Sequence, residues 1–429
     1  MNKIHIFLLA LLSCVTAASG QTAKARYGVF AIRNATLITV SGDTLRGNLV
    51  MRDEKIAALG ANAAIPADAE VIDGTGKFVY PGFIDSGTKI GLEEVRSIEL
   101  TQDFQEVGDV TPQMQALTAV NPNTVHIPVN RAGGVTTALA VPAGGIFPGT
   151  AALIHLHGYT PEAMYAGYKA VTMNFPSAAR RGRFDRRTDE DLKKDLDKKL
   201  KTISDLWAEV RLWAKVDSAH KAGKSAAPAY RPDLAALAPV VAGTAPLMIE
   251  VNTAEDIKAA IAWVKENKVQ AVFTGVAEGW RVAADLAASG IPVITGPMMS
   301  TPVREYDRYD RPYANPGLLH AAGVKVAIRT SQTENVRNLP FNAGFAAAYG
   351  MDKAAALKAI TLYPAQIFGL DKELGSLEVG KSATLIVADG DPFETRSQIT
   401  HVFIRGWLMP DDNRQLGLYR EFLERSPKE

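Results

Sequence analysis

Cysteine is nearly absent from the chain: among 429 residues only Cys14 carries a thiol. It lies in the opening segment MNKIHIFLLALLSCVTAASG, where an apolar run from Ile4 to Val15 is followed by small residues. We interpret residues 1–20 as an export signal cleaved near Gly20, which predicts a periplasmic or secreted protein. The mature chain would then have no thiol, which excludes disulfides and thiolate chemistry. The alternative is cleavage before Cys14 and lipid attachment to its thiol.

An excess of charge of one sign is also missing. The chain has 47 Lys and Arg against 46 Asp and Glu, a formal net charge of +1. Such a balance provides no long-range field toward nucleic acid or an anionic membrane. Beyond the leader, no stretch reaches the roughly 18 uncharged apolar residues of a membrane span, so none is expected.

Short strands punctuated by Gly and Asp occupy both ends of the chain. VFAIRNATLITVSGD and AEVIDGTGKFVYPG stand near the start, and GSLEVGKSATLIVADGDPFE and ITHVFIRGWLM near the end. This pattern is typical of small antiparallel sheets. We predict one β-sandwich domain built from residues 21–80 and 367–412, followed by a C-terminal tail at 413–429.

The middle of the chain, residues 81–366, has a different period. Unbroken apolar strands such as PLMIEV, AVFTG and VKVAI alternate with helix-like stretches, which predicts a parallel sheet covered on both faces. At least seven such strands are present, close to a (β/α)8 barrel. The alternative, a doubly wound open sheet, lacks a Gly-rich phosphate fingerprint. Apolar residues at helical spacing predict a long amphipathic helix within an insertion at 180–222.

Four segments carry a resemblance to a known family. NATLITVSGDTLRGNLVMRDEKIAALG, VIDGTGKFVYPGFID and AITLYPAQIFGLDKELGSLEVGKSATLIVADGDP occur in that order, with RAGGVTTALAVP between the last two. Together they resemble the amidohydrolase superfamily, closest to its imidazolonepropionase-like branch, over nearly the whole chain after the leader. The resemblance implies a (β/α)8 barrel flanked by a β-sandwich made from both chain ends, in agreement with the pattern above.

The resemblance also implies where metal ligands should stand. In that superfamily imidazoles and carboxylates at the C-terminal ends of strands hold a divalent ion, which lowers the pKa of bound water to roughly 7. The corresponding positions here are Gly87 and Lys89 after the first strand, Glu250 at the fifth, Thr274 at the sixth and Ser331 at the eighth. Glycine offers no ligand, and a lysine ammonium repels a cation. We therefore expect the usual metal centre to be lost and Lys89 to form an ion pair with Glu250 across the barrel mouth.

Two other sets of side chains are candidates for chemistry. His155 and His157 are the only two of the seven histidines with ligand-like spacing, and a relocated zinc or other divalent metal site is the alternative to their being structural. Ser331, with Lys89 or Glu250 beside it, is a candidate nucleophile of a metal-free hydrolase. Against this, IRTSQTEN contains neither a nucleophile elbow nor a Ser-x-x-Lys motif.

The acidic stretch TQDFQEVGDVTP resembles a loop that the family places over its pocket. We predict Asp103 and Glu106 of this stretch as cleft residues together with Gly87 and Thr274, the alternative being a plain solvated loop.

The sequence thus favours an exported amidohydrolase-like protein without a metal cofactor. On this interpretation it is non-catalytic or a partner subunit of an intact amidohydrolase, so homo- or hetero-oligomers are both compatible with it. The competing hypothesis is an active hydrolase of carbon–nitrogen bonds in cyclic amides or small peptides, with an atypical site. Fold analogy alone does not decide between the two.

Overall fold

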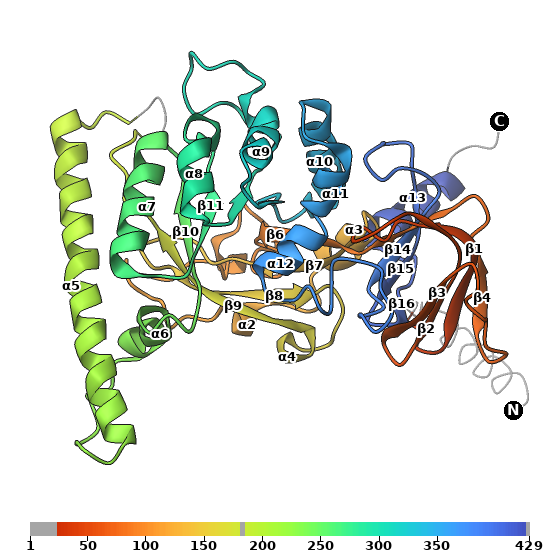
Figure 1. Ribbon diagram of the computed structural model, residues 1–429, viewed down its shortest axis with the longest axis horizontal. Coiled ribbons are helices and arrows are strands. Elements are labelled where there is room, and N and C mark those ends of the chain that lie inside the picture. The colour runs from red at the N-terminus through yellow and green to blue at the C-terminus, as the bar shows by residue number, and fades with distance from the viewer. Residues whose placement is uncertain (1–23, 181–184, 426–429) are drawn as a thin grey trace, which may run out of the picture.

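The computed structural model describes residues 24–180 and 185–425. A barrel lies at the centre, the long helix α5 at one end and a sheet built from both chain ends at the other (Figure 1). The predicted leader, with Cys14, lies outside the described residues. Within them, no helix combines the length and the apolar character needed to cross a bilayer.

The terminal sheet joins the two ends of the chain in one eight-stranded arrangement, with order β16-β15-β14-β5-β1-β2-β3 and β4 paired to β1. Its strands are β1 (Phe30–Leu37), β2 (Leu45–Arg52), β3 (Lys55–Gly60), β4 (Glu70–Asp73), β5 (Phe78–Pro81), β14 (Leu385–Ala388), β15 (Ile399–Ile404) and β16 (Trp407–Leu408). The antiparallel pairing of β5 with β14 joins the two chain ends. Side chains from both halves share one buried core, including Ile32, Leu49, Leu385 and Phe403.

The barrel sheet also has eight strands, in sequence order from β6 to β13. They are β6 (Phe83–Thr88), β7 (Val135–Ala140), β8 (Gly149–His155), β9 (Tyr165–Asn174), β10 (Leu247–Val251), β11 (Ala271–Gly275), β12 (Val293–Thr295) and β13 (Val326–Ile328). Most of their buried residues are apolar, because helices or loops cover the outer face and side chains fill the interior. β6 and β7 also bury polar side chains, among them Asp85 and Thr137. The barrel flanked by a sheet from both chain ends is therefore confirmed.

One strand departs from the expected parallel arrangement. β8 runs antiparallel to both β7 and β9. The loop between β7 and β8, residues 141–148, is rich in Pro and Gly, and it is shorter than the dozen or more residues that a parallel crossover requires. The prediction of an all-parallel sheet is wrong for this strand, and a three-strand meander replaces two of the expected βα units.

Helices lie around the barrel, and α13 lies beside the terminal sheet (Figure 1). They are α2 (Ala116–Ala119), α3 (His126–Arg131), α4 (Pro161–Met164), α5 (Asp189–Lys221), α6 (Pro232–Val241), α7 (Ala254–Asn267), α8 (Ala283–Ser289), α9 (Arg311–Ala321), α10 (Leu339–Ala348), α11 (Lys353–Lys358), α12 (Leu362–Ile367) and α13 (Arg414–Arg425). Short 3₁₀ turns lie at Glu99–Thr101, Gly279–Arg281 and Val336–Asn338.

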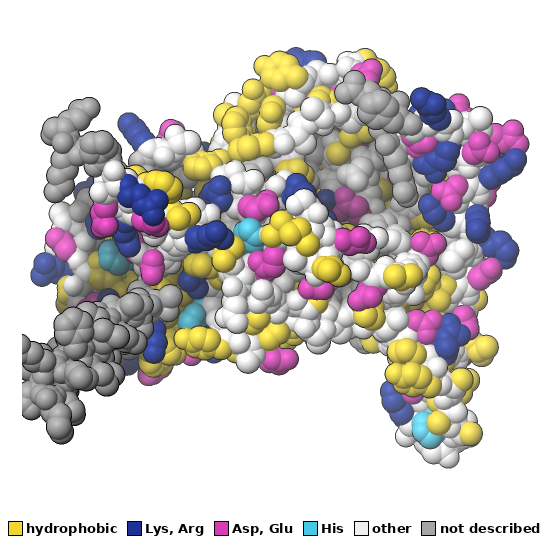
Figure 2. Space-filling model, turned by 180° about the vertical axis from the view of Figure 1, so that it is seen from behind, with side chains coloured by type: hydrophobic (Ala, Val, Ile, Leu, Met, Phe, Trp, Pro, Cys, Tyr) yellow, Lys and Arg dark blue, Asp and Glu magenta, His cyan; other side chains and the backbone are white. Residues whose placement is uncertain are grey.

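The amphipathic helix expected in the insertion is α5, which spans 33 residues. Thr188 begins it with a capping box, because its hydroxyl accepts the Asp191 N–H while the Asp191 carboxylate accepts the Thr188 N–H. Trp207 on its buried face stacks against Phe147 and meets Trp263 edge-on, with ring centroids 6.1 and 5.0 Å away. Its outer face carries both charge signs, seen as mixed blue and magenta side chains at the right edge of Figure 2. A solvated outer face is the direct interpretation of this pattern.

The barrel closes where β13 approaches β6. The Ser331 N–H donates to the Gly87 carbonyl at 3.0 Å, and the Lys89 N–H donates to the Gln332 carbonyl at 3.2 Å. Buried Asp85 reinforces this seam by accepting the Thr330 hydroxyl at 2.5 Å. Burial raises the pKa of Asp85 to about 7, although hydrogen bonds from Thr330 and Gly87 act in the opposite direction. The Asp of the PGFID segment therefore holds the seam together.

Candidate functional site

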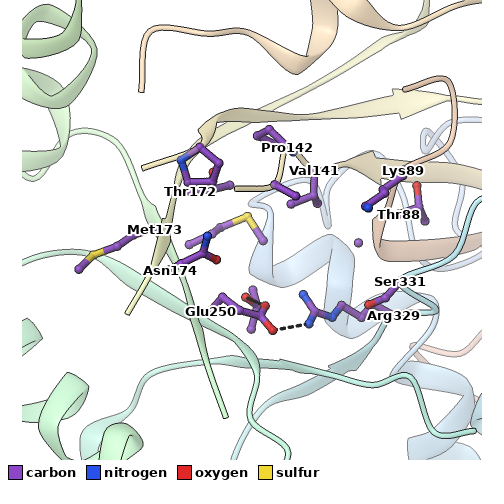
Figure 3. Close-up of a pocket in the computed structure, with 15 residues that line it drawn as sticks. Thr88, Lys89, Val141, Pro142, Thr172, Met173, Asn174, Glu250, Arg329 and Ser331 are labelled. Carbon is purple, nitrogen blue, oxygen red and sulfur yellow. Dashed lines mark hydrogen bonds and ion pairs between the residues drawn. The ribbon is translucent and has the colours of Figure 1, made fainter. Parts of the chain in front are cut away.

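A cavity of about 170 Å³ opens at the C-terminal ends of the barrel strands. Its polar and charged lining residues come from five parts of the chain, and Figure 3 shows most of them: Thr88, Lys89, Thr172, Asn174, Glu250, Thr274, Arg329 and Ser331. Active sites of barrels of this kind are built at this end. Five predicted positions, Gly87, Lys89, Glu250, Thr274 and Ser331, therefore meet in one place.

The centre of the cavity holds an ion pair between Arg329 and Glu250. Arg329 follows β13, and its Nη2 donates to Glu250 Oε1 at 2.8 Å. Glu250 also accepts the Thr274 hydroxyl at 2.6 Å and the Asn252 amide at 3.2 Å. The Arg329 side chain is only 13% exposed. Burial acts to raise the pKa of Glu250, but the charge and hydrogen bonds of Arg329, with those of the two neutral donors, hold it below its usual value.

Gly87 is the position that leaves room for this arginine. A Cβ atom built on Gly87 would lie 2.9 Å from Arg329 Cδ, closer than real Cβ atoms come to a neighbour. Any larger side chain at 87 would displace the stem of Arg329. The glycine at a predicted ligand position and the arginine after β13 are thus two parts of one packing arrangement.

The predicted ion pair between Lys89 and Glu250 is wrong. Glu250 pairs with Arg329 instead, and the Lys89 ammonium lies over the Phe104 ring, 3.4 Å from its centroid. The physical reason is geometric. The planar guanidinium of Arg329 reaches the Glu250 carboxylate from the adjacent side of the cavity. A guanidinium is also more weakly hydrated than an ammonium. Burial lowers the pKa of Lys89, while Glu93 acts to raise it.

Ser331 and Thr274 both line the cavity but differ in their bonding. The Thr274 hydroxyl is committed to Glu250. Ser331 has a left-handed backbone with φ of 53°, an uncommon state for a non-glycine residue that often marks functional positions. Among the described residues, the Ser331 hydroxyl has no hydrogen-bond partner.

Asp103 and Glu106, predicted as cleft residues, do not line this cavity. Both side chains are exposed, and Glu106 borders a separate hollow that also includes Asp109. Phe104, between them, is the member of this loop that turns inward to Lys89. The pattern follows from solvation, since the carboxylates stay hydrated while the aromatic ring is half-buried against the ammonium.

His155 and His157 lie at the other end of the barrel. His155 stands opposite Thr137, near the start of β7, because β8 runs antiparallel. His157 follows the strand and packs on Trp407 of the terminal sheet, with ring centroids 5.4 Å apart. Burial, with nearby arginines, lowers the pKa of each to about 4. Within residues 24–180 and 185–425, no group of three or more His, Cys, Asp or Glu side chains is arranged to hold a metal.

Arg329 is the site residue that the sequence did not single out. Its signal was an arginine directly after the apolar strand VKVAI, two residues before the position expected to hold the eighth-strand ligand. A buried charge is normally paired with an opposite charge. Glu250 was the one carboxylate among the expected ligand positions, and so the one candidate partner there for Arg329.

Comparison with known proteins agrees with this fold. The amidohydrolase family model matches residues 312–409. The solved structure of an amidohydrolase from Thermotoga maritima is 26% identical, with a TM-score of 0.77 over 90% of this chain and 100% of that one. The chain is thus similar to amidohydrolases in sequence over residues 312–409 and in structure over 90% of its length.

Two curated proteins and a further solved structure are also similar to this chain. The amidohydrolase tasK of Hapsidospora irregularis is 23% identical over 408 residues, which are 86% of this chain and 40% of that protein. The D-hydantoinase of Geobacillus stearothermophilus is 34% identical over 89 residues, 21% of this chain and 18% of that enzyme. The chain therefore spans less than half the length of these curated relatives. Molinate hydrolase, at 16% identity and a TM-score of 0.55, shares the fold.

Proposed function

We propose that this amidohydrolase-superfamily protein has lost the usual metal centre and acts as a non-catalytic partner subunit of an intact amidohydrolase. The observation that carries the proposal is the Arg329–Glu250 pair at the barrel mouth. The Arg329 guanidinium forms an ion pair with Glu250, the one carboxylate among the expected ligand positions. The barrel is kept, while its centre is stabilised by an internal ion pair.

The donor set does not fit a divalent cation. Zinc in a catalytic site takes three protein ligands, usually imidazoles with a carboxylate, and the five positions here offer Glu250 as their only charged ligand. A cation beside Glu250 would meet Arg329, whose positive charge opposes it. Lys89 adds a second positive charge to the same lining.

We also propose that the protein is exported. The support is the leader pattern of Lys3, an apolar run and small residues before Gln21. Export would bring the protein into the envelope or the medium, where a related amidohydrolase with intact ligands would be its partner. Lipid attachment at Cys14 remains the alternative route to the same compartment.

A second candidate function is a metal-free hydrolase of carbon–nitrogen bonds. The names of the relatives favour hydrolysis, since two are an amidohydrolase and a D-hydantoinase. Ser331 would be the nucleophile, with Lys89 as the neighbouring base. This candidate needs Lys89 unprotonated, and burial lowers its pKa in that direction.

The test is elemental analysis of the purified, dialysed protein combined with assays on amides, lactams and dipeptides. The proposal expects zinc, manganese and iron far below one atom per chain, and no turnover. One metal per chain would refute the loss of the centre. Turnover that Ser331→Ala abolishes would establish the second candidate instead. Purification from the native host should recover the chain with a ligand-complete amidohydrolase, and recovery as a lone monomer would refute the partner role.

A further inference from the structure

We propose that the barrel-mouth cavity binds a small carboxylic acid with an apolar body, and that the Lys89 ammonium holds its carboxylate. This inference rests on the proposed function, because it requires a mouth without a metal ion. On this proposal, a protein that has lost hydrolysis still binds a ligand in the cavity.

The first support is the charge of the lining. Arg329 and Glu250 neutralise each other at 2.8 Å. Lys89 has no such partner: among the described residues no carboxylate lies within ion-pair distance of its ammonium, which lies over the Phe104 ring. The buried carboxylate Glu93 is already engaged, since it accepts the Thr333 hydroxyl at 2.6 Å and pairs with Arg96 at 3.4 Å. The cavity therefore has one positive charge without an ion-pair partner among the described residues.

The second support is a free hydroxyl beside that charge. The two hydrogen bonds of the barrel seam, Ser331 N–H to Gly87 and Lys89 N–H to Gln332, bring residues 89 and 331 to adjacent strand ends. Both side chains line the cavity and lie on the same side of it in Figure 3. A carboxylate has two oxygens, so one would accept from the Lys89 ammonium and the other from the Ser331 hydroxyl.

The third support is the apolar wall facing these donors. It is formed by Val141, Pro142, Ala143, Pro148, Met173 and Met248. The cavity of about 170 Å³ is smaller than the roughly 300–1,000 Å³ typical of sites for drug-sized ligands. A bare inorganic anion would leave this wall without contact. A short branched aliphatic chain would cover it.

The cavity also discriminates against a free amino group. An ammonium on the ligand would need an anionic partner, and Glu250 is already bonded to Arg329, Thr274 and Asn252. Lys89 would in addition repel it. An amino acid zwitterion should therefore bind more weakly than the acid that has the same carbon skeleton without the amino group.

Calorimetric titration with three matched compounds tests this: 4-methylpentanoate, its neutral amide 4-methylpentanamide, and leucine. The sample is the dialysed full-length protein, with metal content measured on the same preparation. The acid should bind at least about tenfold more tightly than the amide, since hydrogen bonds to a charged group are the stronger ones. Leucine should also bind more weakly than the acid. Inorganic phosphate serves as the comparison without an apolar body.

Variants locate the binding. Lys89→Met should abolish the preference for acid over amide, and Lys89→Arg should retain it. Lys169→Met is the matched control, because Lys169 also lies over an aromatic ring, Tyr165, at 5.4 Å but is exposed and outside the cavity. Ser331→Ala should weaken binding of the acid by a smaller factor than Lys89→Met does.

Several outcomes would overturn the inference. Equal binding of acid and amide, binding of the acid that survives Lys89→Met, or phosphate binding as tight as the acid would each do so, and so would no binding of the acid at all. These outcomes with no metal in the sample would leave the proposed function standing. One metal per chain would instead refute the proposed function itself.

Discussion

Replacing Arg329 by methionine should destabilise the protein because it leaves Glu250 charged and without its cation. The pair is neither fully buried nor free in solvent, since the side chains are 13% and 32% exposed. Removing one partner of a buried pair costs roughly 3–5 kcal/mol, whereas exposed pairs contribute about 1 kcal/mol or less. Glu250 also keeps its bonds from Thr274 and Asn252. We therefore expect Arg329→Met to lower the free energy of unfolding by about 2 kcal/mol.

The decisive measurement is a double-mutant cycle with Glu250→Leu, using urea unfolding followed by tryptophan fluorescence and circular dichroism. The double variant should be more stable than the sum of the single changes predicts, with a coupling energy of about 1–2 kcal/mol. The control cycle uses Arg26 and Glu70, an ion pair at 2.7 Å with side chains 57% and 48% exposed. It should show coupling of about 0.5 kcal/mol or less. Additivity at Arg329 and Glu250 within about 0.5 kcal/mol would refute the pair as a stabilising element.

Three further predictions follow from other parts of the chain. Burial and nearby positive charge hold the pKa of His155 at about 4, below its ordinary 6.5. As pH falls, this imidazole is therefore protonated in the unfolded state before it is protonated in the folded state. Between these pH values the wild type should lose stability as pH falls, by on the order of 3 kcal/mol more than His155→Gln, and equal slopes in urea unfolding would contradict this. The double variant Gly87→His and Lys89→His should bind no zinc by elemental analysis, because Arg329 fills the space beside position 87; stoichiometric zinc would contradict this. Intact mass of envelope protein should show a chain beginning near Gln21, and cytoplasmic protein retaining the leader would contradict export.

Much of the fold could be predicted because its signals are local. Apolar runs of five residues followed by helical stretches indicate barrel strands such as β10 and β11 without any tertiary information. The direction of β8 was missed although its signal was present in the short Pro- and Gly-rich loop at 141–148. Strand periodicity is the same for either direction, so only the connection length carries that information.

The sequence pointed to Gly87, Glu250 and Ser331, which line the barrel-mouth cavity, but not to the ion pair inside it. These three positions were singled out by the resemblance to the amidohydrolase superfamily and not by a local pattern. Arg329 and Glu250 are 79 residues apart in the sequence. No local pattern indicates which cationic side chain pairs with Glu250, because the pairing depends on how the side chains lie in the folded barrel. Lys89 and Arg329 are both plausible partners by charge, and only the structure shows that the guanidinium occupies the centre.

The meander of β7, β8 and β9 has a consequence for the order in which the molecule folds. Its antiparallel neighbours are consecutive in sequence, so little chain entropy is lost in bringing them together. The closing seam is the opposite case, since Asp85 and Thr330 meet across 245 residues. The meander should therefore form early and the seam late. Lys89 lies on one side of that seam and Ser331 on the other. A chain in which the seam has not formed would therefore lack the proposed carboxylate site, and binding of the acid would indicate that the barrel has closed.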